Sequence, residues 1–155
     1  MTHPSGGIST PVIATPETQT AVEFLGGLVR FRAGSQDTGG NYALLEHTGE
    51  RGYMSPLHQH RADEETFLIL EGSLRVEVGT DTYQVGAGGL ALLPRGLAHG
   101  FVVTSPQARF LTLHTPGGFD RFVAQASDAR ASDPAELTRM AAAHGIDIVG
   151  PPLLP

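Results

Sequence analysis

The sequence contains no cysteine and no lysine, and these two absences remove several kinds of chemistry. Without cysteine there is no thiolate nucleophile, disulfide, iron–sulfur cluster or cysteine-built zinc site. All ten basic residues are arginine, so there is no Schiff-base lysine and no phosphate-binding lysine of a P-loop. The Gly-x-Ser-x-Gly pattern of serine hydrolases is also missing. Covalent catalysis through cysteine or lysine is therefore excluded.

Positive charge and long apolar runs are also scarce. Ten arginines against 16 acidic residues give a formal net charge of -6, which leaves no basic surface for nucleic acid. The N-terminal segment lacks a charged start followed by an apolar run, and no stretch reaches the ~18 apolar residues of a membrane span. We expect a cytoplasmic protein that binds neither nucleic acid nor membranes.

The 155 residues fit one domain, and 20 glycines and 11 prolines indicate many turns. Short runs of Val, Leu, Phe, Tyr and Thr between glycine-rich breaks predict an antiparallel all-β domain. The Glu71–Ser73 and Gly79–Asp81 segments are expected to form hairpins, and Gly86–Gly89 allows positive φ. The predicted strands are Val22–Arg32, Tyr42–His47, Leu57–His60, Thr66–Leu70, Leu74–Val78, Thr82–Val85, Leu90–Leu93, His99–Val103 and Arg109–His114.

The composition changes on both sides of this region. Residues 1–20 are rich in Pro, Ser, Thr and Gly, which favours a flexible N-terminal arm, and residues 21–115 form the β-domain. Residues 116–155 predict a helical extension, with helical spacing over Phe119–Ala126. A second helix begins with Asp133–Glu136, which combines an N-cap, a first-turn proline and a capping-box glutamate, and it ends near Gly145. The proline-rich Gly150–Pro155 closes the chain.

Two histidines and a carboxylate lie within eight positions. His58 and His60 are two residues apart, so on a strand their imidazoles face the same way. A turn at Arg61–Glu64 can return Glu65 beside them, and His99 can add a fourth group from another strand. Neutral imidazoles bind borderline divalent ions well, and a carboxylate offsets charge and exchanges protons. These residue types together point to a metal site.

The same residues resemble the two motifs of the cupin superfamily. The first motif, G-x5-H-x-H-x3-4-E-x6-G, is matched by Gly52, His58, His60, Glu65 and Gly72. The second motif, G-x5-P-x-G-x2-H-x3-N, is matched by Gly88, Pro94, Gly96 and His99, with Val103 in place of the final Asn. The resemblance implies a single cupin barrel, a double-stranded β-helix or jelly roll, with a short C-terminal helical tail. It also implies that His58, His60, Glu65 and His99 bind one divalent transition metal ion.

Several choices within this site rest on position. The nitrogen and oxygen ligands suit nickel, cobalt, manganese, iron, copper or zinc. Glu64 also fits the shorter form of the first motif, but only Glu65 leaves six residues before Gly72, so we prefer Glu65. His47 is interpreted as a surface or packed histidine, although it could point into the barrel. His114 ends a strand where it could contribute to the pocket rim, and a structural role is favoured. His144 at a helix C-terminus and His3 in the arm receive no chemical role.

The three-histidine, one-glutamate set resembles that of quercetin 2,3-dioxygenases. The segments Thr115–Phe122 and Gly145–Pro152 are similar to the ending of small bacterial single-domain members of that group. The resemblance implies oxidative opening of a flavonol ring by dioxygen with loss of carbon monoxide. In that chemistry Glu65 is the catalytic residue that accepts the substrate proton. The implied partners are dioxygen and a small apolar or aromatic substrate, and the usual assembly of such a fold is a homodimer.

Two other functions stay open at this point. One keeps the metal but changes the reaction, as in a cyclase, an isomerase or another oxygenase. The other is a non-catalytic cupin that binds a small ligand. No arginine cluster near the motifs suggests a phosphate clamp, so a sugar phosphate is not the expected substrate.

Overall fold

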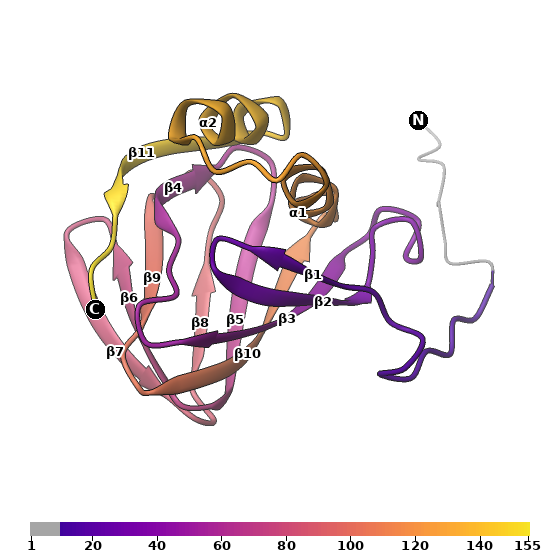
Figure 1. Cartoon of the computed structure of the whole chain (residues 1–155), viewed down its shortest axis with the longest axis horizontal. Helices are drawn as coiled ribbons and strands as arrows, with labels where there is room; N and C mark the ends of the chain where they lie inside the picture. Colours follow the sequence, from indigo (N-terminus) through magenta and orange to yellow (C-terminus); the bar gives the residue numbers. More distant parts are fainter. Residues whose placement is uncertain (1–9) are drawn as a thin grey trace.

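The computed structural model describes residues 10–155. Residues 1–9 of the predicted N-terminal arm, including His3, lie outside the described residues. Residues 10–20 carry no helix or strand and are mostly exposed. In Figure 1 this segment leads away from the body of the molecule before the first strand begins.

The described chain forms two antiparallel sheets and two short helices (Figure 1). One sheet has the order β1-β2-β3-β10-β5-β8 and the other β11-β4-β9-β6-β7. This arrangement confirms the predicted all-β jelly roll with a short C-terminal helical tail. The elements are β1 Ala21–Phe24, β2 Gly27–Ala33, β3 Ala43–Glu50, β4 Pro56–His60, β5 Glu64–Glu71, β6 Ser73–Val78, β7 Asp81–Gly86, β8 Leu90–Leu93, β9 His99–Val103, β10 Gln107–Thr115, α1 Phe119–Asp128, α2 Pro134–Ala143 and β11 Ile146–Pro152.

Aromatic side chains fill much of the barrel interior. Phe67, Phe101 and Phe110 come from three strands, are 6% exposed or less, and lie with ring centroids 5.2 to 5.8 Å apart. Alternate residues of β10 are buried from Ala108 to His114, as expected for a strand with one face on a core. The strand periodicity therefore places every second β10 side chain inside the barrel.

One predicted strand is wrong, because Val22–Arg32 contains two strands. β1 and β2 form a hairpin in which Phe24 pairs with Gly27. The turn residues Leu25 and Gly26 both have positive φ, 52° and 85°. Two positive φ values are what a tight two-residue hairpin turn requires, and Gly26 supplies one of them without strain.

The segment at Gly72 is also not the hairpin that was expected. β5 and β6 belong to different sheets, so Gly72 lies where the chain crosses from one sheet to the other. A Cβ at Gly72 would lie 2.2 Å from the backbone oxygen of Gln107, and the residue has φ 77°. Glycine is therefore required by close backbone approach. The predicted hairpin at Gly79–Asp81 is confirmed, since Val78 pairs with Asp81.

Both predicted helices are present, and a strand that was not predicted follows them. Pro134 is the first residue of α2 and Gly145 follows that helix with φ 79°. β11 then pairs antiparallel with β4, with Ile146 opposite His60 and Ile148 opposite His58. The helices lie across one end of the barrel in Figure 1, where Phe122 and Val123 of α1 join a second apolar cluster.

Two surface properties bear on earlier expectations. Among the described residues, neither helix has the length and apolar character needed to cross a membrane. On edge strand β8, Leu90 and Leu92 are 60% and 62% exposed. The homodimer stays a prediction.

Candidate metal centre

Four side chains from three strands meet inside the barrel. His58 and His60 lie on β4, and His99 of β9 pairs directly with His58. Glu65 comes from β5 in the other sheet, after the short turn that follows His60. All four are buried, at 7% exposed or less. The structure thus brings together the four residues that the two motifs single out.

Their polar atoms converge on one small volume. Oε2 of Glu65 lies 2.9 Å from Nε2 of His99, 3.1 Å from Nε2 of His60 and 3.9 Å from Nε2 of His58. The two Nε2 atoms of His58 and His60 are 3.1 Å apart. One donor atom from each residue lies within 4.8 Å of all the others.

The far nitrogen of each imidazole has its own acceptor. Nδ1 of His58 lies 2.7 Å from the Pro56 carbonyl oxygen, and Nδ1 of His99 lies 3.1 Å from the Leu97 carbonyl oxygen. A carbonyl only accepts, so both Nδ1 atoms must carry the proton. Nδ1 of His60 donates in the same way to Oδ1 of Asp63 at 3.0 Å.

These acceptors leave the Nε2 atoms as the metal-facing side of each ring. In neutral imidazoles the lone pairs of His58 and His60 point at each other across 3.1 Å, beside the carboxylate oxygen of Glu65. Lone pairs at that separation repel unless a positive charge lies between them. The arrangement is therefore that of a cation-binding site in which the hydrogen bonds on the outer side of each ring are already formed.

The electrostatics of the metal-free chain lead to the same conclusion. Burial lowers the pKa of His60, but Asp63 and Glu65 outweigh it and raise this pKa to about 10. Burial raises the pKa of Glu65, yet positive charge on His114 and hydrogen bonds from the three imidazoles hold it well below its usual range. Burial lowers the pKa of His58. An ionised Glu65 thus keeps a proton on His60 when no other cation is close.

The donor set fits a divalent transition ion. Three imidazole nitrogens and one carboxylate oxygen, without sulfur, suit ions from manganese to zinc better than calcium, which takes mainly oxygen ligands. The buried His58, His60, Glu65 and His99 cluster is consistent with a metal site.

The two neighbouring glutamates have different environments. Glu65 faces the imidazoles, whereas both oxygens of Glu64 lie 3.0 Å from Nη2 of Arg95 at the surface. The Arg95 hydrogen bond lowers the pKa of Glu64. Adjacent residues of a strand point to opposite faces, so only one of the two can reach the cluster. The structure places Glu65 there.

Three further polar residues adjoin the cluster: His114, for which the sequence favoured a structural role over one at the pocket rim, and Thr112 and Asp63, which received no role of their own. His114 of β10 pairs with Glu65 across the strands and is fully buried. Its Nε2 lies 3.6 Å from Oε1 of Glu65 and 3.1 Å from the hydroxyl of Thr112, and its Nδ1 lies 3.3 Å from Oδ2 of Asp63. Asp63 therefore accepts from both His60 and His114.

A hydrogen-bonded chain continues from Thr112 into the aromatic core. The Thr112 hydroxyl lies 3.0 Å from Nε2 of His47, whose Nδ1 lies 2.9 Å from the Tyr53 hydroxyl. The His47 ring stacks on Phe110 at 4.8 Å. Burial lowers the pKa of His47 to about 3, so this histidine is neutral. His47 is thus a packed histidine that points into the barrel.

A signal for these residues exists in the sequence. Phe110, Thr112 and His114 occupy alternate positions of one strand, so a buried Phe110 implies that the other two also face inward. The contacts of Asp63 with His60 and His114 had no such signal, because they depend on how the turn after His60 folds.

A small cavity of about 70 Å³ lies beside the cluster, and His58 is its one residue from the four. Apolar side chains from the β1–β2 hairpin, both helices and β11 form most of its wall. The lining residues are Phe24, Leu25, Ser55, Pro56, His58, Phe119, Phe122, Leu137, Ala141, Ile146 and Ile148. A substrate group at His58 would therefore meet an apolar surface.

Comparison with known proteins agrees with this fold. Residues 45–114 match the cupin domain family. Over 85 residues the chain is 27% identical to quercetin 2,3-dioxygenase of Bacillus subtilis. The aligned region covers 55% of this chain and 25% of that protein. The chain thus spans about a quarter of that relative.

Two solved structures are similar to about two thirds or more of this chain. The polyketide cyclase RemF from Streptomyces resistomycificus is 26% identical, with a TM-score of 0.58, over 68% of this chain and 80% of that chain. An RmlC-like cupin from Shewanella frigidimarina is 16% identical, with a TM-score of 0.63, over 72% and 96% of the two chains. The second likeness concerns the fold alone.

The double acceptor role of Asp63 generates a pH prediction. Burial raises the pKa of Asp63, but His114 and His60 lower it from 3.8 to about 2. Because the pKa of Asp63 is lower in the folded protein than in the unfolded chain, its ionised carboxylate stabilises the fold at pH values above the unfolded-state pKa of 3.8. This stabilisation is lost as the pH falls through the folded-state pKa of about 2. In urea unfolding of chelator-treated protein, Asp63→Asn should be less stable than the wild type at neutral pH. The gap should close between pH 4 and pH 2.

Asp81→Asn, in the exposed β6–β7 turn, is the matched control and should show no pH-dependent gap. A gap for Asp63→Asn that stays constant from pH 7 to pH 2 would show that the ionised carboxylate is not the source of the stabilisation.

Proposed function

This chain is a cupin-domain protein, and from that premise we propose that it is a metal-dependent dioxygenase of the quercetin 2,3-dioxygenase type. It would open a flavonol-like aromatic substrate with dioxygen. The observation that carries the proposal is the convergence of Glu65 Oε2 with the Nε2 atoms of His58, His60 and His99 in the interior of the barrel. The similarity to the Bacillus dioxygenase over 55% of this chain supports the choice of reaction.

His58, His60, Glu65 and His99 would hold one divalent ion, which supplies polarisation of a substrate hydroxyl when bound. Pro56, Asp63 and Leu97 keep the three rings in the tautomer that presents Nε2. Their hydrogen bonds thus orient the ligands before anything binds.

Glu65 would accept the hydroxyl proton of the substrate. Oε2 lies nearest to the imidazoles, so Oε1 is the oxygen left to take the proton. The carboxylate is ionised at neutral pH because the surrounding imidazoles hold its pKa low. His114, 3.6 Å from Oε1, limits how that oxygen can turn. The apolar cavity beside His58 keeps water away from the reacting group.

A second function is favoured by one observation, the 26% identity to a polyketide cyclase over 80% of that chain. That likeness covers more of this chain than the match to the dioxygenase does. Ring closure of a polyketide consumes no dioxygen, which separates it from the first proposal. The shared requirement is an apolar aromatic substrate beside His58.

Dioxygen uptake tests the proposed reaction. We expect metal-loaded protein to consume dioxygen when given a panel of flavonols, with carbon monoxide as a gaseous product. The measurement uses an oxygen electrode and gas analysis, with chelator-treated protein as the control. Turnover of a polyketide-type substrate without dioxygen uptake would replace the dioxygenase by the cyclase.

Metal content tests the ligand set. His58→Ala, His60→Ala and His99→Ala should each strongly lower the metal bound per chain, because each removes one of only three imidazoles. The fold should survive, because the aromatic core of the barrel does not depend on the ion. His144→Ala, which removes a half-buried histidine outside the cluster, should retain the metal. Full occupancy in all three variants, or calcium as the tightly bound ion, would contradict the assignment.

The two glutamates provide a matched pair for the proton transfer. Glu65→Gln keeps the shape and one oxygen but cannot accept a proton as a carboxylate does, so kcat per bound metal should fall by ~10²- to 10⁴-fold. Glu64→Gln removes only a surface ion pair with Arg95 and should turn over normally. Loss of turnover in Glu64→Gln with normal turnover in Glu65→Gln would reverse the assignment, and normal turnover in both would remove the proton transfer from the mechanism.

A further inference from the structure

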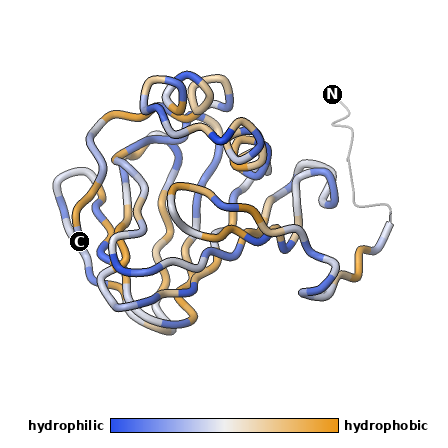
Figure 2. The backbone as a smooth tube through the Cα atoms, in the orientation of Figure 1, coloured by the Kyte–Doolittle hydropathy of each residue, from blue (hydrophilic) through white to orange (hydrophobic). Residues whose placement is uncertain are grey.

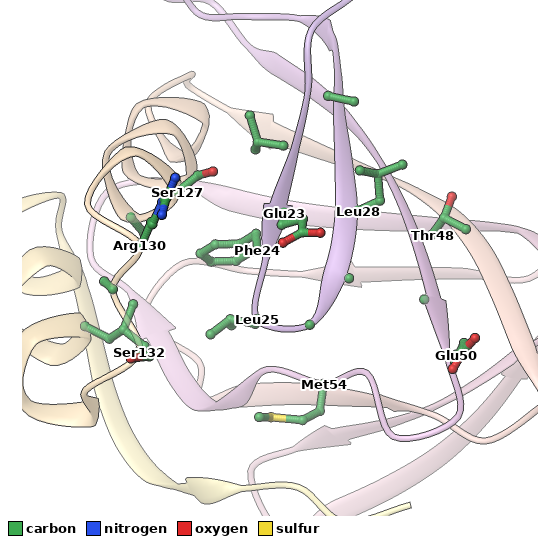
Figure 3. A pocket seen from close by; sticks show the side chains of 18 of the residues that line it. Glu23, Phe24, Leu25, Leu28, Thr48, Glu50, Met54, Ser127, Arg130 and Ser132 are labelled. Atoms are coloured by element: carbon green, nitrogen blue, oxygen red, sulfur yellow. The ribbon is translucent and has the colours of Figure 1, made fainter.

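A cleft lies beside the β1–β2 hairpin and is much larger than the cavity at His58. Its volume is about 1290 Å³. It is lined by residues 21–28 of the hairpin, residues 48–50 of β3, Met54, and the segment between the two helices. Figure 3 shows Phe24 and Leu25 projecting from the hairpin toward the segment with Arg130 and Ser132, with Met54 below.

Only three side chains line both the cleft and the cavity. They are Phe24 and Leu25 of the hairpin and Leu137 of α2. Phe24 is 8% exposed and meets Phe122 edge to face at 5.7 Å. Leu25 packs on both apolar clusters of the protein. These three side chains form a wall, and the cleft is on one side of it and His58 on the other.

The two volumes decide how a substrate can bind. Pockets that bury a drug-sized ligand have roughly 300 to 1,000 Å³, and one water molecule occupies about 30 Å³ of liquid. The cavity of about 70 Å³ is too small for a flavonol, whereas the cleft of about 1290 Å³ is large enough. A flavonol with one ring at His58 therefore needs space beyond the cavity, and the neighbouring cleft provides that space if the wall between them moves.

The hairpin that carries two of the wall residues lies at the edge of its sheet. β1 is an edge strand that pairs only with β2, so the hairpin is held by a single neighbouring strand, β3. Leu25 has φ 52° and Arg130 has φ 49°, and within residues 10–155 these are the two non-glycine residues with positive φ. Both line the cleft. Strain of this kind collects at ligand-binding and switching segments.

The hairpin is also shaped to rest on the barrel. A Cβ at Gly27 would lie 2.5 Å from the Tyr53 ring, whereas a Cβ at Gly26 would have no neighbour within 4 Å. Gly27 at the base of the turn thus lies in close contact with the Tyr53 ring, whereas Gly26 in the turn itself has free space around it. Both strands of the hairpin carry hydrophobic residues, which Figure 2 shows in orange.

We propose that the cleft binds the non-reacting part of the substrate and that Leu25, with Phe24 and Leu137, determines which molecules pass to His58. The identity of the substrate rests on the proposed function, but the route does not. The occupant is an extended, uncharged aromatic molecule. The cleft lining is slightly more apolar than polar, and the two exposed carboxylates Glu23 and Glu50 outnumber its one cation, Arg130, so anions are disfavoured and hydroxyl groups find acceptors.

The absence of cysteine from the sequence allows a direct test of access. Ser55→Cys places one thiol in the cavity, at a residue that is 9% exposed. In chelator-treated protein, its reaction rates with the small reagent methyl methanethiosulfonate and with the bulky, neutral N-(1-pyrenyl)maleimide are compared. Adding Leu25→Ala should raise the pyrenyl maleimide rate about tenfold, equivalent to about 1.4 kcal/mol in the opening equilibrium, and the small reagent should respond much less.

Leu28→Ala is the matched control, because Leu28 lies on the same hairpin and lines the cleft but not the cavity. It should leave both rates unchanged. Equal acceleration by the two variants, equal acceleration of the two reagents, or no acceleration by Leu25→Ala overturns the proposal. If Ser55→Cys does not fold, Ala141→Cys on α2 places the thiol in the same cavity.

This experiment uses neither metal nor substrate. A failed dioxygen assay therefore leaves the access route to be judged on the labelling rates alone. Conversely, labelling rates that contradict the role of the wall leave the proposed reaction to be tested by the dioxygen assay.

Discussion

The buried carboxylate of Glu65 is the constraint on which the site depends. A charge that is 4% exposed is expensive to bury unless positive partners surround it. Strands from both sheets place imidazoles around Glu65, His58 and His60 from β4, His99 from β9 and His114 from β10, and the raised pKa of His60 makes that residue a positive partner. Each added imidazole must itself be satisfied, which brings in backbone carbonyls and Asp63. The polar centre is thus a connected network inside an otherwise aromatic barrel.

The network also explains why the tail matters. The end of the barrel beside His58 is covered mainly by apolar side chains. The hairpin, the two helices and β11 provide these side chains, including Phe119, whose ring stacks on His114 at 4.3 Å. The C-terminal segment is therefore part of the site environment, since β11 is hydrogen bonded to the strand that carries His58 and His60.

Sequence reasoning predicted which four side chains would cluster, because their spacing is local or fixed by a motif. His58 and His60 share a strand face, and the spacing to Gly72 selected Glu65 over Glu64, which the structure shows on the surface with Arg95. Contacts that depend on tertiary folding were not predicted. The wall of Phe24, Leu25 and Leu137 joins segments more than a hundred residues apart, and the hairpin turn at Leu25 was hidden inside an apolar run. β11 was missed because its alternation is short and ends in prolines.

The pairing of β11 with β4 has a consequence for biosynthesis. The ribosome makes residues 146–152 long after the strand that carries His58 and His60, yet Ile146 and Ile148 lie directly opposite those two histidines. While only the strands up to β10 have been made, one edge of β4 therefore remains unpaired. The edge of β4 that faces away from β9 is therefore covered only after residues 146–152 have been made, although His58 and His60 themselves are made much earlier.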